Sequence, residues 1–125
     1  MRVGRVALAG DAAHLVNPFG GTGLTSGMVD GGGLADCLIG IFQGKVSNPD
    51  AILSKYDEER RRVFREFTSP VSTANKARMR QTAEEALTKD DFIKFLANSS
   101  DEEKAEAGMG NFAMQVDFTE FYDRA

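Results

Sequence analysis

The chain has 125 residues, of which 42% are hydrophobic and 27% are charged, and its formal net charge is −4 at pH 7. These proportions are typical of a folded globular protein, and the length fits one small domain. The net negative charge argues against general electrostatic binding to nucleic acid or to anionic membranes. No apolar run is as long as a membrane span, and the first residues lack the features of a signal peptide. We therefore expect a cytoplasmic protein with no nucleic-acid partner and no membrane span.

The first predicted element is a short β-strand over residues 6–9, an apolar run bounded by Gly4 and Gly10. Such a run is typical of a buried parallel strand. No other segment predicts a strand, and a lone strand cannot satisfy its own backbone hydrogen bonds. We therefore expect the partner strands of this sheet to be missing from the chain.

A glycine-rich loop follows the strand and leads into a helix predicted over residues 23–42. An acid at the end of a strand, a glycine loop and a helix N-terminus together suit an anionic or nucleotide-like ligand. The apolar residues of the helix share one face, which we expect to be buried: Leu24, Met28, Leu34, Leu38 and Ile41. Glycines 31–33 indicate either close packing against another backbone or a local break.

The remainder is predicted to be helical. Asn48, Pro49 and Asp50 are typical of a helix start, and that helix should run to about Phe67. A third helix is predicted from Ser69–Pro70 to about Arg80. Two further starts are predicted from pairs three residues apart, Thr88 with Asp91 and Ser100 with Glu103, and the last helix should end at Gly108.

The tail beyond residue 111 carries several apolar residues, which either dock on a partner surface or form a satellite cluster of this domain: Phe112, Val116, Phe118, Phe121 and Tyr122. The sequence thus predicts a mainly α fold with one short N-terminal β-strand. We expect two regions, residues 1–46 with the strand, glycine loop and first helix, and residues 47–125 as a helical C-terminal region. Together they would form one continuous partial domain.

The motifs of the first region carry a resemblance to a known family. They are Gly4-Arg5-Val6, Gly10-Asp11-Ala12-Ala13-His14, Pro18-x-x-Gly21-x-Gly23 and Asp30. This pattern, over about the first 40 residues, resembles the second flavin-contacting motif of the FAD-dependent aromatic hydroxylases, the flavoprotein monooxygenases related to para-hydroxybenzoate and phenol hydroxylase. In that family the motif lies well past the middle of the protein, and a separate G-x-G-x-x-G turn, which this sequence lacks, binds the ADP half of FAD. The resemblance therefore implies a C-terminal segment of a larger α/β FAD-binding fold, without its N-terminal dinucleotide-binding portion.

The resemblance also implies a cofactor, a reaction and a set of contacts. FAD would be the cofactor, NAD(P)H its reductant, and an aromatic or polycyclic compound the substrate hydroxylated with oxygen. Asp11 would accept hydrogen bonds from the ribityl hydroxyls, and Pro18 would face the substrate. The residues expected to contact FAD are Gly10, Asp11, Gly20, Gly21, Thr22, Gly23, Leu24 and Thr25.

Each of these residue types has a physical reason to be there. Glycines permit a flat ring to approach the backbone closely, and the N–H groups of Gly23, Leu24 and Thr25 can stabilise negative charge on the flavin N1–C2=O edge. The family usually has asparagine where this chain has Thr25. That change keeps the backbone N–H and removes a side-chain amide.

Other titratable residues are expected to be structural, so that no catalytic residue and no metal ligand is predicted. His14 should make a structural hydrogen bond, and Cys37 should be a buried thiol. Residues 60–62, three arginines, should form a solvated helix face, and residues 101–103 should be a charge cluster at a helix start.

Two hypotheses about function follow. The first is a segment of a flavin-dependent monooxygenase that is inactive as an isolated chain. The alternative is a non-catalytic helical interaction module or a truncated gene product. The coding sequence upstream of residue 1 would distinguish them.

Overall fold

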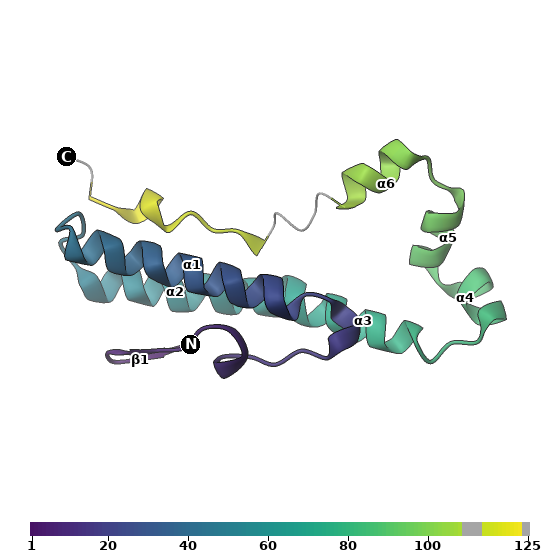
Figure 1. Ribbon diagram of the computed structural model, residues 1–125, viewed down its shortest axis with the longest axis horizontal. Helices are drawn as coiled ribbons and strands as arrows, with labels where there is room; N and C mark the ends of the chain where they lie inside the picture. The colour runs from purple at the N-terminus through teal and green to yellow at the C-terminus, as the bar shows by residue number, and fades with distance from the viewer. Residues whose placement is uncertain (109–113, 124–125) are drawn as a thin grey trace.

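The computed structural model describes residues 1–108 and 114–123, and most of them are helical. The predicted fold class, mainly α with a short β element at the N-terminus, is confirmed. Figure 1 shows a long pair of helices in the middle, a β-hairpin on one side of it and an arm of short helices extending from its end. No helix in the described part of the chain is long and apolar enough to cross a membrane.

The β element is a hairpin of two very short strands, β1 (Arg2–Val3) and β2 (Val6–Ala7). They pair in antiparallel register, with Val3 opposite Val6. The prediction that residues 6–9 form a lone buried parallel strand is therefore wrong. Gly4 has a φ of 56°, a left-handed conformation that allows a two-residue turn, so the chain folds back and supplies a partner from its own first residues. Val3 and Val6 are exposed, because no layer in the described chain covers them.

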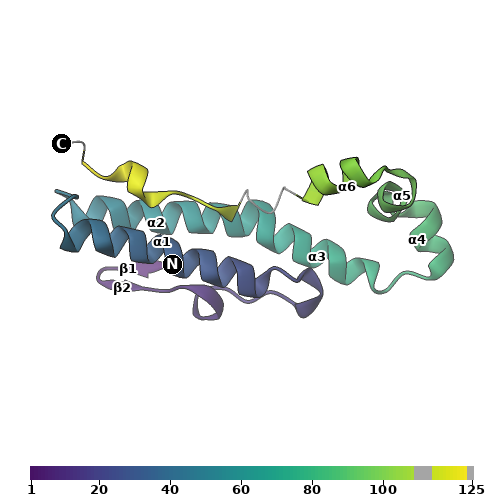
Figure 2. The same cartoon turned by 45° about the horizontal axis from the view of Figure 1, so that its top comes forward.

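The central pair consists of α1 (Gly23–Phe42) and α2 (Pro49–Val63), which lie side by side in both views (Figures 1 and 2). The predicted bounds of the first helix are confirmed. The Asn48 side chain caps α2 by accepting the Ala51 N–H at 3.1 Å, as its position predicted.

The chain does not break before Ser69–Pro70. A π-helical turn (Phe64–Thr68) joins α2 directly to α3 (Ser69–Arg78). Proline has no N–H and crowds the carbonyl four residues earlier, and the wider π turn accommodates it within a continuous helix. At Ser69–Pro70, where a separate third helix was predicted to start, the structure instead changes from a π-helical to an α-helical turn without a break.

The buried face of α1 differs from the predicted apolar face. Of the five predicted residues, Leu24, Met28 and Leu38 are exposed, and Leu34 and Ile41 are partly buried against the core. The fully buried residues are small or polar: Ser26, Asp30, Gly33, Cys37 and Gly40. The reason is close packing of aromatic side chains from the C-terminal segment. A Cβ atom on Gly33 would lie 2.6 Å from the Phe118 ring. The glycine run therefore packs closely at one position without breaking the helix, while Gly31 and Gly32 face open space.

A small apolar core holds the hairpin, the two long helices and the C-terminal segment together. Its buried members are Met1, Cys37, Val46, Ile52, Tyr56 and Phe118. Phe118 belongs to a 3₁₀ turn (Phe118–Phe121) and packs against Tyr56, and the Tyr122 hydroxyl donates to the Asp36 carbonyl. Of the two alternatives for the tail, Phe118 thus joins this domain. Phe112 lies outside the described residues.

The arm consists of α4 (Ala83–Lys89), α5 (Asp91–Asn98) and α6 (Asp101–Gly108), and it extends beyond the end of α3 and then turns back toward the central pair (Figures 1 and 2). Helix α4 was not predicted, although Thr82 and Glu85 form a capping box at its start. The cap of α5 is Asp90, not Thr88, because the Asp90 carboxylate accepts the N–H groups of Phe92 and Ile93. The predicted Ser100–Glu103 capping pair is confirmed, and α6 is described as far as Gly108.

Candidate functional site

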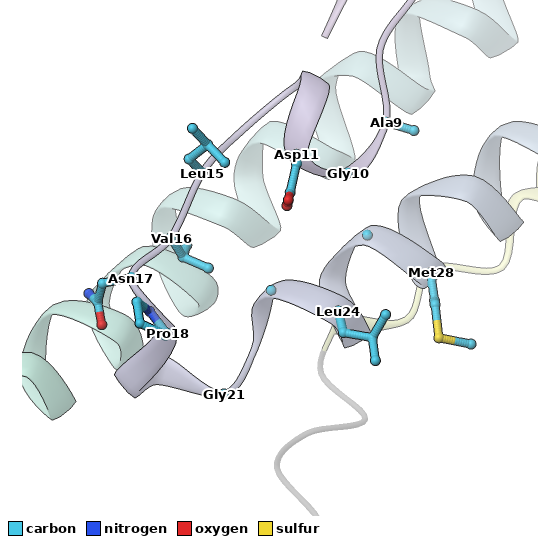
Figure 3. Close-up of a pocket in the computed structure, with 12 residues that line it drawn as sticks. Ala9, Gly10, Asp11, Leu15, Val16, Asn17, Pro18, Gly21, Leu24 and Met28 are labelled. Carbon is cyan, nitrogen blue, oxygen red and sulfur yellow. The ribbon is translucent and has the colours of Figure 1, made fainter.

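A cavity of about 650 Å³ lies between the 3₁₀ turn Gly10–Ala12, the following loop and the start of α1. This volume falls within the range of small-molecule sites. Six of the predicted contact residues line it: Gly10, Asp11, Pro18, Gly21, Gly23 and Leu24. The other lining residues were not predicted: Ala9, Leu15, Val16, Asn17, Gly27 and Met28. Figure 3 shows the cavity with these residues.

The remaining three predicted contact residues, Gly20, Thr22 and Thr25, line a second cavity behind the loop. Gly21 contributes to both cavities, so the glycine loop is the wall between them. Gly20 also lets the loop pack closely against α3, because any larger residue would place its Cβ atom 2.7 Å from the Ser72 Cβ.

The turn that carries Asp11 is held directly against α1. Gly10 has a φ of 60°, and its backbone approaches Gly27 so closely that a Cβ on Gly27 would lie 3.3 Å from the Gly10 Cα. The Gly10 N–H donates to Asp30 Oδ2 at 3.0 Å. In Figure 3 the Asp11 side chain points from this turn into the space beside α1. The two glycines and Asp30 thus fix the position of the turn that carries Asp11.

Asp30 is the centre of a buried polar network. Its side chain is fully buried, and Oδ1 accepts the Arg60 Nε–H at 2.7 Å. His14 Nε2 lies 2.7 Å from Oδ2 and carries the proton, since a carboxylate only accepts. Arg60 also donates to the Met114 carbonyl at 2.6 Å. The network therefore links the turn, both long helices and the C-terminal segment.

Arg60 corrects the prediction of a solvated arginine face, because only 1% of its side chain is exposed. It lies on the inner face of α2 with Ile52, Tyr56 and Val63, and this spacing of three or four residues is the sequence signal that distinguishes it from its neighbours. Arg61 and Arg62 are on the surface as predicted and pair with nearby acids of the same helix.

The two other reactive side chains, those of His14 and Cys37, make contacts inside the fold. The His14 ring stacks on Phe64 with 4.7 Å between ring centroids, in addition to its contact with Asp30. Burial, and next the negative charge of Asp36, raise the pKa of the Cys37 thiol to about 11. A thiol with that pKa is protonated at neutral pH and is a poor nucleophile. Among residues 1–108 and 114–123, no group of three His, Cys, Asp or Glu side chains could hold a metal ion.

Helix α1 begins beside both cavities, with Gly23 and Leu24 lining the first and Thr25 the second. Thr22 occupies the N-cap position, but its side chain makes no capping hydrogen bond. Within the described chain, the first backbone N–H of this turn with a carbonyl partner is that of Ser26, so the N–H groups of Gly23, Leu24 and Thr25 stay available. The helix dipole adds partial positive charge at this end. The cavity therefore combines a carboxylate on one side with N–H donors on the other.

Comparison with known proteins connects this geometry to a family. A sequence profile of the family described as FAD binding domain matches residues 1–70. The chain is 46% identical over 90 residues to para-nitrophenol 4-monooxygenase of Pseudomonas sp. strain WBC-3, an alignment that covers 72% of this chain and 22% of that protein. It is 45% identical over 75 residues to 6-hydroxy-3-succinoylpyridine 3-monooxygenase HspB of Pseudomonas putida, covering 60% of this chain and 19% of that protein.

A third relative is 3-(3-hydroxy-phenyl)propionate/3-hydroxycinnamic acid hydroxylase 2 of Burkholderia vietnamiensis. It is 52% identical over 58 residues, covering 46% of this chain and 10% of that protein. The chain thus spans about a fifth or less of the length of these relatives. No solved structure matches it.

Proposed function

Because this chain belongs to the FAD binding domain family, we propose that it forms the flavin-ring side of the FAD site in a longer aromatic monooxygenase. FAD is the cofactor of the family, and we infer NAD(P)H as its reductant and an aromatic ring compound as the substrate. When bound, reduced FAD supplies the electrons with which oxygen is activated for ring hydroxylation. The chain's own residues would bind and orient the cofactor.

One observation carries the proposal: a single cavity brings together the Asp11 carboxylate, a wall of glycines and the uncapped end of α1. A flat ring needs backbone approach without side chains, which Gly21 and Gly23 provide. A polyhydroxyl chain needs an acceptor, which Asp11 provides. The residues present therefore fit a flavin and its ribityl chain.

The donors at the start of α1 have a chemical consequence in this proposal. The N–H groups of Gly23, Leu24 and Thr25 can hydrogen-bond a carbonyl oxygen, and the helix dipole stabilises negative charge that develops there. Replacement of the usual asparagine by Thr25 leaves this backbone contact intact. Gly20 and Thr22 would act by shaping the loop.

Pro18 lies in the same cavity and is our candidate for the residue that faces the substrate. The relatives are named for para-nitrophenol, a hydroxylated pyridine and hydroxyphenyl acids, all of which are aromatic rings with polar substituents. We propose a substrate of that class for the longer enzyme.

The test is flavin retention by Asp11→Ala in the enzyme that contains this chain together with its upstream coding sequence. A hydrogen bond to a charged group contributes about 1.5–3 kcal/mol, so FAD affinity should fall by roughly tenfold or more. The measurements are flavin absorbance per protein after purification and oxidation of NAD(P)H that depends on an aromatic compound.

Asp91→Ala is the matched control, because Asp91 is an exposed acid at the start of α5, away from the cavity. It should purify with full flavin. If the unmodified enzyme neither retains nor binds FAD, the proposal is wrong and the interaction-module alternative is favoured. If the unmodified enzyme binds FAD and Asp11→Ala binds it equally well, Asp11 is a turn residue without a cofactor contact.

A further inference from the structure

A third cavity, of about 370 Å³, lies between the ends of the β-hairpin, the turn that follows it and the junction of α2 with the π-helical turn. It shares no lining residue with the two cavities described above. Its volume is sufficient for a small organic molecule. The lining combines apolar and basic residues, and no acidic residue of the described chain belongs to it: Met1, Leu8, Ala13, His14, Arg61, Phe64 and Arg65.

Two of the lining residues are arginines, Arg61 and Arg65. They are four residues apart in the continuous helix formed by α2 and the π-helical turn, so they are neighbours on one side of it. Arg61 Nε donates to Asp57 at 2.9 Å, whereas Arg65 has no acidic partner within the described chain. Two guanidinium groups at one cavity favour a ligand with several acceptor oxygens, because each group presents a fork of N–H donors.

His14 gives an independent indication of a ligand. Its side chain is only 6% exposed, and its Nδ1 is buried without a hydrogen-bond partner in the described chain. Buried polar atoms in folded proteins normally have a partner. Because Nε2 donates its proton to Asp30, the neutral ring carries a lone pair on Nδ1. The partner that Nδ1 lacks is therefore a hydrogen-bond donor.

These groups call for one ligand that offers acceptor oxygens to the arginines and an O–H group to His14. We propose that the cavity binds the monoanion of a small phosphate monoester. Its unprotonated oxygens would accept from Arg61 and Arg65, and its P–OH group would donate to Nδ1 of His14. The organic group of the ester would contact Leu8 and Phe64.

The proton on the ligand is what selects this class of anion. A phosphate monoester loses its second proton with a pKa of about 6, so the monoanion is available near neutral pH. Carboxylates and sulfate monoesters have no such proton in that range. The phosphates of FAD form a diester and also lack it. The inference therefore concerns a ligand other than FAD and does not require the proposed function to be correct.

The test is binding of three probes to the 125-residue chain without FAD at about pH 6, where about half of an alkyl phosphate keeps its second proton. The probes are n-butyl phosphate, n-butyl sulfate and inorganic phosphate. Butyl phosphate should bind about fivefold more tightly than butyl sulfate, which has no O–H group for Nδ1. It should also bind more tightly than inorganic phosphate, which has no apolar group to bury.

His14 is the single histidine of the chain, so its ring nitrogens can be assigned without ambiguity by ¹⁵N NMR. Butyl phosphate should shift the Nδ1 resonance in proportion to the bound fraction, because Nδ1 gains a donor. Butyl sulfate should shift it far less. An anion held by the arginines alone would leave this resonance in place.

One variant with a matched control locates the site. Arg65→Gln should weaken butyl phosphate binding about fivefold, because it removes a charged donor. Arg62→Gln should leave it unchanged, because Arg62 pairs with Glu59 and Glu66 and does not line the cavity. Both arginines are exposed, so both variants should fold, which circular dichroism checks.

The proposal is overturned if butyl phosphate does not bind, or if butyl sulfate binds equally well. It is also overturned if saturating butyl phosphate leaves the Nδ1 resonance of His14 in place, or if Arg65→Gln and Arg62→Gln have the same effect on binding. Flavin retention by the longer enzyme tests the proposed function and has no bearing on these outcomes.

Discussion

Asp30 shows how one buried side chain can position a functional turn. A fully buried carboxylate loses its hydration, and here three donors replace it: the Gly10 N–H, His14 Nε2 and Arg60 Nε. Charge neutralisation by Arg60 makes this burial tolerable. The Gly10 N–H is one of these three donors, and Gly10 directly precedes Asp11. The position of Gly10 therefore depends on Asp30 and, through Asp30, on Arg60 of α2.

We expect Asp30→Asn to lower the free energy of unfolding of the chain by roughly 3–5 kcal/mol, because it leaves the Arg60 charge buried without its partner. Urea unfolding followed by circular dichroism measures this. Asp91→Asn, which removes an exposed acid, should cost less than about 1 kcal/mol.

The double variant Asp30→Leu/Arg60→Met distinguishes a charge effect from a packing effect. Because it removes both charges, it should recover much of the stability lost in Asp30→Asn. A double variant that is less stable than the single one would show that the network stabilises the fold beyond mutual neutralisation.

At the scale of elements, the glycine loop and the start of α1 act together. The structure holds Gly21 at a φ of 63°, which favours glycine, whereas Gly23 lies at the first position of α1. Space beside Gly23 is limited, because a Cβ there would lie 3.3 Å from Val16 Cγ2. A side chain at Gly23 would therefore press on Val16 and occupy part of the cavity.

In the longer flavoprotein, Gly23→Val should abolish tight FAD binding, while Thr25→Ala should retain it. Valine fills space at the cavity, whereas alanine keeps the backbone N–H that Thr25 is expected to offer. Flavin content and a thermal melt of the apoprotein should be measured together. Flavin loss should far exceed destabilisation for Gly23→Val. A Thr25→Ala protein that holds FAD less well than Gly23→Val would show that the contact lies elsewhere in the loop.

Element positions were predicted from local signals, but burial was not. The bounds of α1 and the Asn48 cap of α2 follow from residue types within a few positions, and both are confirmed. The buried face of α1 depends on Phe118, some 80 residues away along the chain, which no local pattern contains. The Asp30–Arg60 pair was missed for the same reason. In the candidate site, the loop glycines and Asp11 were predicted from the motif. Gly27 was not predicted, because its role is to pack against Gly10, which no local pattern indicates.

At the scale of the whole molecule, apolar side chains are exposed at several places in the described chain, and two of these places lie next to the proposed flavin site. One is the hairpin, with Val3 and Val6, and the other is the outer face of α1, with Leu24, Met28 and Phe42. Large exposed apolar patches on a protein surface usually mark interaction sites. In the proposed enzyme, the remaining sheet of the FAD-binding fold would cover them, which agrees with the small share of each relative that the chain spans.

The proposed function also sets an expectation for what the 125-residue chain binds by itself. Its cavity offers contacts for a flavin ring and a ribityl chain, but the sequence contains no G-x-G-x-x-G turn for the ADP half. The ADP half contributes a large part of the surface that FAD buries in such folds. We therefore expect the chain to bind FAD weakly, and riboflavin nearly as well as FAD. Titration followed by flavin fluorescence measures both affinities. Submicromolar FAD binding at one-to-one stoichiometry, with riboflavin far weaker, would show instead that this chain holds an adenine-nucleotide site of its own.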